Sequence, residues 1–181
     1  MALKSTIFKA DLQIADMDRG YYRDHSLTIA RHPSEHDARM MVRVLAFALH
    51  AHDALSFADG LAAIDQPDLW QRDLTGSVQL WIDVGQPDEK LLRKACSRAE
   101  QVVVYAFGRA VDAWWDRSRP ALARLTNLSV RVVPQPATDA LAALVQRTMR
   151  LQCTVQDGQV WLGSQAASVP VELGTLQQAR F

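Results

Sequence analysis

Apolar and polar residues alternate with a period of two near the N-terminal end of the chain. The alternation runs through residues 4–16 and resumes over residues 21–31, and the segment between them, 16–20, has the composition of a turn. A period of two is typical of a strand with one buried face. The pattern therefore predicts a β-hairpin.

A different spacing follows, with apolar residues three and four positions apart, which predicts an amphipathic helix over residues 34–55. Ser34 is its expected N-cap. Glu35, Arg39 and Arg43 are four residues apart and fall on the polar face. An ion pair between Glu35 and Arg39 along this face is one expectation, and a phosphate-binding patch formed by Arg31, Arg39 and Arg43 is another.

The rest of the chain alternates between strand and helix patterns. Strands are predicted over 67–73, 77–84, 102–107 and 128–133, and helices from Pro87 and over 109–124. A hairpin is predicted over 147–156 and 159–163, because Asp157-Gly158 is a strong two-residue turn signal. Weaker patterns suggest a helical turn over 137–144 and an edge strand over 169–173, and the last eight residues are expected to fray. This order predicts an α/β (α+β) fold in which a mixed sheet is flanked by helices.

Composition narrows the class of protein. The chain has 181 residues, so we expect a single domain over residues 1–181. Twenty basic and 20 acidic residues give a net charge of zero, which argues against a non-specific, histone-like nucleic-acid binder. Cys96 and Cys153 are too few for a disulfide framework and are expected to be buried thiols. No segment has the length of a membrane span, and we expect a cytoplasmic protein without a membrane partner.

Two carboxylates are expected to meet in the predicted hairpin over residues 67–84. If its turn is centred on Thr75-Gly76, the opposed pairs are Asp68–Asp83, Trp70–Trp81 and Arg72–Gln79. Like charges opposed on a sheet are destabilising, so a divalent cation or a shared proton is expected between Asp68 and Asp83. A longer loop or a one-residue slip would separate them. In the plainer interpretation, Asp68 is a turn residue and Asp83 merely ends a strand.

Several blocks of the chain resemble the YaeQ family of bacterial proteins, and the similarity covers essentially the whole chain. They are 27–35 (LTIARHPSE), 80–85 (LWIDVG), 86–90 (QPDEK), Trp114-Trp115, 127–130 (NLSV) and 156–162 (QDGQVWL). The resemblance implies no settled biochemical function. It implies a fold, a compact version of the restriction-endonuclease-like PD-(D/E)XK nuclease fold.

That fold implies roles for individual residues. Asp68 and Asp83 match the two acidic elements that hold Mg²⁺, together with the backbone carbonyl of Val84. The position of the motif lysine is Gly85. In such nucleases this lysine positions the attacking water and offsets developing charge.

Some members of the wider fold take the lysine from the following helix instead. Here Lys94 is the preferred substitute and Lys90 the second choice, and a solvated helix face is the plain alternative for both. Glu35 matches an acidic residue at the start of the first helix, which binds a second metal or orients a metal water.

Two other signals are weaker. His50 and His52 are two apart, so on a helix they point in different directions and are not expected to bind one metal. Trp114 and Trp115 are adjacent, so we expect one buried and one half-exposed indole rather than a pair that stacks bases.

Three functions remain open at this stage. The first is metal-dependent phosphodiester hydrolysis on nucleic acid, with Asp68 and Asp83 as metal ligands and Lys94 and Glu35 as catalytic residues. The second is a catalytically inactive relative of the nuclease fold that binds nucleic acid or protein, which the missing lysine and the zero net charge favour. The third is an adaptor with no polynucleotide ligand.

Overall fold

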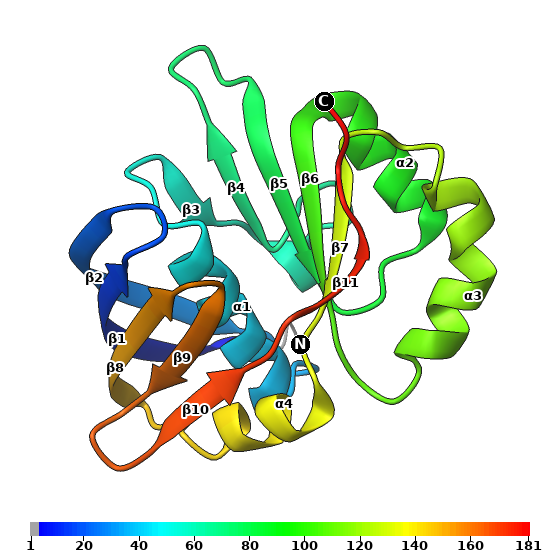
Figure 1. Ribbon diagram of the computed structural model, residues 1–181. Coiled ribbons are helices and arrows are strands. Elements are labelled where there is room, and N and C mark those ends of the chain that lie inside the picture. The colour runs from blue at the N-terminus through cyan, green and yellow to red at the C-terminus, as the bar shows by residue number, and fades with distance from the viewer. Residues whose placement is uncertain (1–3) are drawn as a thin grey trace. The chain divides into compact units, whose positions relative to one another are not determined.

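Strands and helices alternate through residues 4–181, the part of the chain that the structure, a computed structural model, describes (Figure 1). The predicted mixed α+β class is confirmed. The strands form two mixed sheets rather than the one predicted, in the orders β10-β9-β8-β1-β2 and β11-β7-β6-β5-β4-β3. Contacts within the chain group it into two compact units. The first ends at Leu49 and resumes over Pro136–Glu172, and the second comprises His50–Gln135 and Leu173–Phe181. We describe each by itself.

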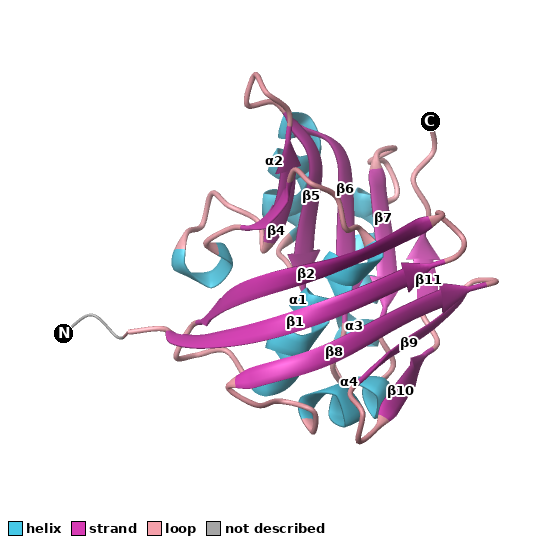
Figure 2. Ribbon diagram, turned by 90° about the vertical axis from the view of Figure 1, so that its left-hand side faces the viewer, coloured by secondary structure: helices cyan, strands magenta, loops and turns pink. Residues whose placement is uncertain are grey.

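The first unit contains the five-stranded sheet. Strand β1 lies inside the sheet and pairs antiparallel with β2 and parallel with β8, a partner more than 130 residues away in sequence. Figure 2 shows the sheet with α1 and α4 behind it. The elements are β1 (Thr6–Asp16), β2 (Tyr21–Arg31), α1 (Asp37–Leu49), α4 (Gln135–Ala142), β8 (Thr148–Gln156), β9 (Gln159–Gly163) and β10 (Ser168–Val171).

Helix α1 is shorter than the sequence pattern predicts. It spans Asp37–Leu49 instead of residues 34–55, and Ser34 is not its N-cap. The Ser34 hydroxyl lies 2.6 Å from Nδ1 of His32, and the Glu35 N–H donates to the His32 carbonyl, so this stretch is a turn. Residues Met40–Ala48 are all buried. The helix is therefore apolar around most of its circumference. More of its surface is buried than the spacing of apolar residues in the sequence predicts.

The second unit contains the six-stranded sheet, in which β5, β6 and β7 run parallel and the β3, β4 and β11 pairings are antiparallel. Helices α2 and α3 lie side by side on one face (Figure 1), where Leu92 and Trp114 pack into a core with Val102, Val104 and Leu128. The elements are β3 (Leu55–Phe57), the 3₁₀ turn η1 (Gly60–Ala62), β4 (Leu69–Arg72), β5 (Val78–Val84), α2 (Glu89–Arg98), β6 (Ala99–Ala106), α3 (Val111–Leu122), β7 (Leu128–Val132) and β11 (Gly174–Gln177).

The C-terminal prediction is wrong. Residues 174–181 were expected to fray, but Gly174–Gln177 forms β11 on the edge of the second sheet, and the Arg180 N–H donates to the Thr126 carbonyl. Gln177 adds an amide that donates to the carbonyls of Leu122 and Leu125. These bonds order a segment whose composition carries no strand signal.

Helix α2 begins differently from the prediction as well. Pro87 does not occupy its first turn, because Asp88 is the N-cap and its carboxylate accepts from the Lys90 N–H at 2.8 Å. Within residues 4–181, no helix combines the length and the apolar character needed to cross a membrane.

Candidate functional site

The hairpin of β4 and β5 has the register that the sequence predicts around its tryptophans. Leu69 pairs with Ile82 and Trp70 with Trp81. Asp68 immediately precedes β4, one step beyond Leu69, and Asp83 is one step beyond Ile82. The ladder ends where Leu69 pairs with Ile82, and the Asp68 N–H donates to the Ile82 carbonyl. The two carboxylate-bearing residues therefore lie at the same end of the hairpin.

The turn of this hairpin is longer than the two residues assumed. Arg72 pairs with Val78 rather than with the predicted Gln79, so residues 73–77 form a five-residue loop, and a bulge follows. The Asp73 carboxylate holds the loop by accepting from the Thr75 hydroxyl at 2.6 Å and the Ser77 N–H at 3.0 Å. The Thr75 hydroxyl in turn lowers the pKa of Asp73. The bulge offsets the longer loop, which preserves the predicted pairing of Trp70 with Trp81.

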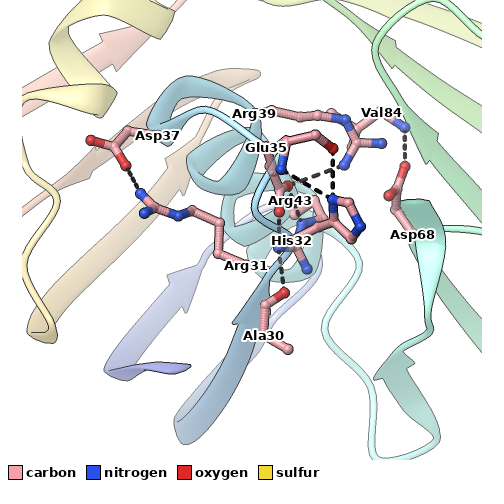
Figure 3. Close-up of polar contacts among 10 residues, drawn as sticks. Ala30, Arg31, His32, Glu35, Asp37, Arg39, Arg43, Asp68 and Val84 are labelled. Atoms are coloured by element: carbon pink, nitrogen blue, oxygen red, sulfur yellow. Dashed lines mark hydrogen bonds and ion pairs between the residues drawn. The ribbon is translucent and has the colours of Figure 1, made fainter. Parts of the chain in front are cut away.

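Asp68 is built into the structure. It is 3% exposed, and its Oδ2 accepts from the backbone N–H of Val84 at 2.8 Å (Figure 3). Its own N–H donates to the Ile82 carbonyl. Its Oδ1 lies against Gly60, where an added Cβ would come within 2.6 Å of that oxygen. Asp68 is therefore not merely a turn residue after Pro67.

Asp83 lies on the face of the sheet that α2 covers. Its Oδ2 accepts from the indole N–H of Trp81 at 2.9 Å. Burial, and to a lesser extent the charge of Asp83, raises the pKa of the Cys96 thiol to about 11. The negative charge of Asp83 therefore disfavours ionisation of the Cys96 thiol on α2. The indole donor fixes the orientation of the Asp83 side chain from within its own strand.

Gly85, which the sequence resemblance places at the position of the motif lysine, has a backbone conformation that suits glycine. Its φ is +103°, and its N–H donates to the Tyr105 carbonyl of β6 at 2.9 Å. Residues with a Cβ rarely adopt such a φ. The chain therefore leaves β5 in a conformation that disfavours lysine at this position.

Lys94, the preferred substitute, points to the loop that precedes β4. Its Nζ lies 2.8 Å from Oδ1 of Asp65, and the ammonium lowers the pKa of this carboxyl by hydrogen bonding and by charge. Lys94 is 57% exposed. Lys90 is exposed too. The helix is anchored by Leu92 and Ala95, whereas Leu91 is 41% exposed.

Glu35 lies in the first unit and is engaged by two arginines. Its two oxygens accept from Nε and Nη2 of Arg43 at 2.8 and 2.7 Å, and Oε1 also accepts from Arg39 at 3.1 Å (Figure 3). The Glu35 side chain is 2% exposed and that of Arg43 is 6% exposed. The expected Glu35–Arg39 contact is confirmed, but the shorter, bidentate contact is with Arg43. Residues eight apart on one helix lie about 12 Å apart along its axis, so this contact depends on Glu35 lying in the turn before α1, which the spacing did not predict.

Two arginines of the expected phosphate-binding patch, Arg31 and Arg43, are paired with carboxylates. Arg43 is buried against Glu35, and Arg31 pairs with Asp37 and lies over the Phe8 ring. These guanidinium groups balance carboxylates within the first unit. The structure thus gives them a role as counter-ions.

The weaker sequence signals have structural explanations. His50 lies beyond the end of α1 and contacts the Tyr105 hydroxyl at 2.6 Å, while Nδ1 of His52 accepts from the Ala54 N–H. Trp114 is 5% exposed and donates to the Pro87 carbonyl, whereas Trp115 is half-buried, as expected. Within residues 4–181, no three His, Cys, Asp or Glu side chains are grouped so that they could hold a metal ion.

Comparison with known proteins finds a family profile and relatives that are all described as YaeQ proteins. The sequence profile described as YaeQ protein matches residues 1–173. The uncharacterized protein YaeQ of Escherichia coli K12 is 41% identical over 179 residues, which covers 98% of this chain and 99% of the relative. The uncharacterized protein YaeQ of Salmonella typhi has the same identity and coverage.

Two solved structures are similar over nearly their full length. The crystal structure of the YaeQ protein from Xanthomonas axonopodis pv. citri shares 50% of its sequence and matches with a TM-score of 0.93, covering 97% of this chain and 99% of that one. The YaeQ protein from Pseudomonas syringae shares 36%, also with a TM-score of 0.93, covering 96% and 97%.

Proposed function

The chain belongs to the YaeQ family, and we propose that Asp68 and Asp83 form a Mg²⁺ site for phosphodiester hydrolysis on nucleic acid. The observation that supports this proposal is the ladder of β4 and β5, which ends with Leu69 opposite Ile82 and so brings Asp68 and Asp83 to the same end of the hairpin. By resemblance, these two positions match the metal-binding carboxylates of the PD-(D/E)XK fold. The two-sheet architecture is compatible with that fold.

The donor set suits a hard cation. Mg²⁺ binds through one or two protein carboxylates and keeps several waters. One oxygen of each carboxylate already accepts from a fixed donor, the Val84 N–H for Asp68 and the Trp81 indole for Asp83. Such donors orient a metal-binding carboxylate. When bound, Mg²⁺ polarises the phosphoryl group and neutralises its charge.

Other residues have supporting roles in this proposal. The ion pair of Lys94 with Asp65 is exposed and therefore weak, so Lys94 is free to leave it and place its ammonium beside a bound phosphate. Lys90, one turn earlier on α2, is the second choice. Glu35, which the sequence resemblance implies as an assisting acid, lies in the first unit, where its two arginine partners fix its orientation. The two free thiols, whose pKa values burial raises, suit the reducing cytoplasm.

A non-catalytic binding module is the second candidate, and the backbone of Gly85 favours it. A motif lysine is disfavoured at a φ of +103°. The positive charge that such a lysine would supply is therefore missing at position 85. In that case the same face binds nucleic acid or a protein without cleaving it.

Thermal unfolding in Mg²⁺ or Mn²⁺ tests the metal site. At a concentration 100 times the dissociation constant, a bound cation should raise the Tm of the wild type by roughly 5–10 °C. Asp83→Ala should lose this shift, and Asp116→Ala, which removes an exposed carboxylate on α3, should keep it. If metal leaves the wild type unchanged and Asp83→Ala is more stable in metal-free buffer, the carboxylates only repel each other and the proposal is wrong.

A further inference from the structure

Two arginines lie over two tryptophans on the second unit. The Arg72 guanidinium is 4.3 Å from the centroid of the Trp70 ring, and that of Arg98 is 5.6 Å from the Trp81 ring. The two indoles are opposed across β4 and β5 and meet edge to face with centroids 6.3 Å apart. The four side chains form one continuous group, which we call the Trp70 strip.

The two arginines of the strip make no close ion pair, although the charge of Arg98 contributes to the lowered pKa of Asp65. Within residues 4–181, neither Arg72 nor Arg98 has an ion pair within 4 Å. Arg98 donates to the backbone carbonyl of Asp65, whose carboxylate is taken by Lys94. Elsewhere in the chain the pattern differs, since Arg93 of the same helix pairs with Glu89 and Arg43 pairs with Glu35. The strip is therefore a locally basic site on a chain of zero net charge.

The strip also presents a rigid aromatic surface. Trp70 is half-buried, and the edge-to-face contact with buried Trp81 fixes its orientation. Trp81 is two residues from Asp83 along β5, and its indole N–H donates to Oδ2 of Asp83 at 2.9 Å. Because alternate residues of a strand share a face, the strip adjoins Asp83 at the end of the hairpin.

We infer that the Trp70 strip binds single-stranded nucleic acid, an inference that deepens the proposed function and rests on it for the chemistry at Asp68 and Asp83. Bases stack on indole and guanidinium planes irrespective of sequence, and phosphates pair with arginines that lack carboxylate partners. A duplex hides the faces of its bases from such a surface. The strip therefore favours unpaired strands.

Binding of a fluorescein-labelled 20-nucleotide DNA, single-stranded or as a duplex, tests the inference in EDTA by anisotropy. The single strand should bind at least tenfold more tightly than the duplex. Trp70→Ala should weaken binding roughly five- to 100-fold, with Trp70→Phe closer to the wild type. Arg72→Gln and Arg98→Gln should each lower the slope of log K against log salt by about one half to one.

Matched variants are the controls. Trp115→Ala removes a half-buried indole of α3, and Arg93→Gln removes an arginine of α2 that has a carboxylate partner; both should bind like the wild type. Urea unfolding identifies any variant that fails to fold. Equal affinity for single strand and duplex, no binding at all, or equal losses in strip and control variants would overturn the inference.

The outcomes separate the inference from the proposed function. Binding in EDTA does not need the cation, so it reports on the strip alone, whereas the Mg²⁺-dependent shift in Tm and the hydrolysis report on the metal site. If the single strand binds at the strip but Mg²⁺ neither stabilises the chain nor supports hydrolysis, the strip is confirmed and the metal site is wrong. If Mg²⁺ stabilises the wild type but the strip variants bind normally, the inference is wrong and the metal site stands.

Discussion

The backbone N–H of Val84 donates to Oδ2 of Asp68 at 2.8 Å, which joins the last residue of β5 to the residue before β4. Val84 directly follows Asp83, so this one bond fixes the end of the hairpin where both carboxylates lie. The other oxygen of Asp68 lies against Gly60. The position of the Asp68 carboxylate thus depends on a glycine that carries no charge and no functional group.

Gly60→Ala tests this dependence. Its new Cβ would come within 2.6 Å of Asp68 Oδ1, and φ at this position is +46°. Gly20→Ala is the matched control, because φ is +64° and no atom lies within 4 Å of the added Cβ. Both variants place an alanine at a left-handed φ, which lowers the free energy of unfolding by about 1 kcal/mol. Gly60→Ala should lose about 1–3 kcal/mol more in urea unfolding and should weaken any Mg²⁺-dependent shift in Tm. Equal losses in the two variants would show that Gly60 does not set the position of Asp68.

Gly85→Lys restores the motif lysine in sequence only. At a φ of +103° any side chain is strained, and the free energy of unfolding should fall by about 1–3 kcal/mol. Gly85→Ala should lose the same amount, because no atom lies within 4 Å of the added Cβ. The Tm of both variants and their hydrolysis of labelled DNA are the measurements. A Gly85→Lys protein with wild-type stability and faster hydrolysis would contradict the backbone explanation of the missing lysine.

The sequence predicted the pairing of Trp70 with Trp81, but with a wrong turn. Alternation along each strand fixes which residues share a face, and this part of the argument was confirmed at Trp70 and Trp81. The length of the loop was not encoded in the alternation. It follows from hydrogen bonds of the Asp73 side chain, which a pattern of apolar positions does not report.

The division into two sheets was also beyond the sequence pattern. The parallel pairing of β1 with β8 joins distant parts of the chain, and periodicity within a strand says nothing about its partner. Strands β3 and β11 are three and four residues long, too short to show an alternation. The Trp70 strip was missed for a related reason, since Arg98 reaches Trp81 from a helix and only the fold brings them together.

Glu35→Gln should be strongly destabilising whatever the role of Glu35 in catalysis. The variant removes the charge that balances Arg43, which is buried, and Arg39. Breaking a buried pair in this way costs about 3–5 kcal/mol. Asp37→Asn is the control, because the Asp37 side chain, the partner of Arg31, is 44% exposed, and the loss of such a pair costs at most about 1 kcal/mol. Urea unfolding measures both, and similar losses would contradict the structural role of Glu35.

The two thiols should make the chain less stable in alkaline solution. Burial, followed by the charge of Asp16, raises the pKa of Cys153 to about 12, and burial raises that of Cys96 to about 11. In the unfolded chain both thiols ionise near their ordinary pKa of about 8.5. Between this value and pH 11 the unfolded chain therefore holds fewer protons than the folded one, so the free energy of unfolding falls as pH rises. Urea unfolding from pH 8 to 10.5 should show a smaller decline for Cys153→Ala than for the wild type, although this variant is less stable at pH 8. An identical decline in both proteins would show that Cys153 ionises equally in the two states.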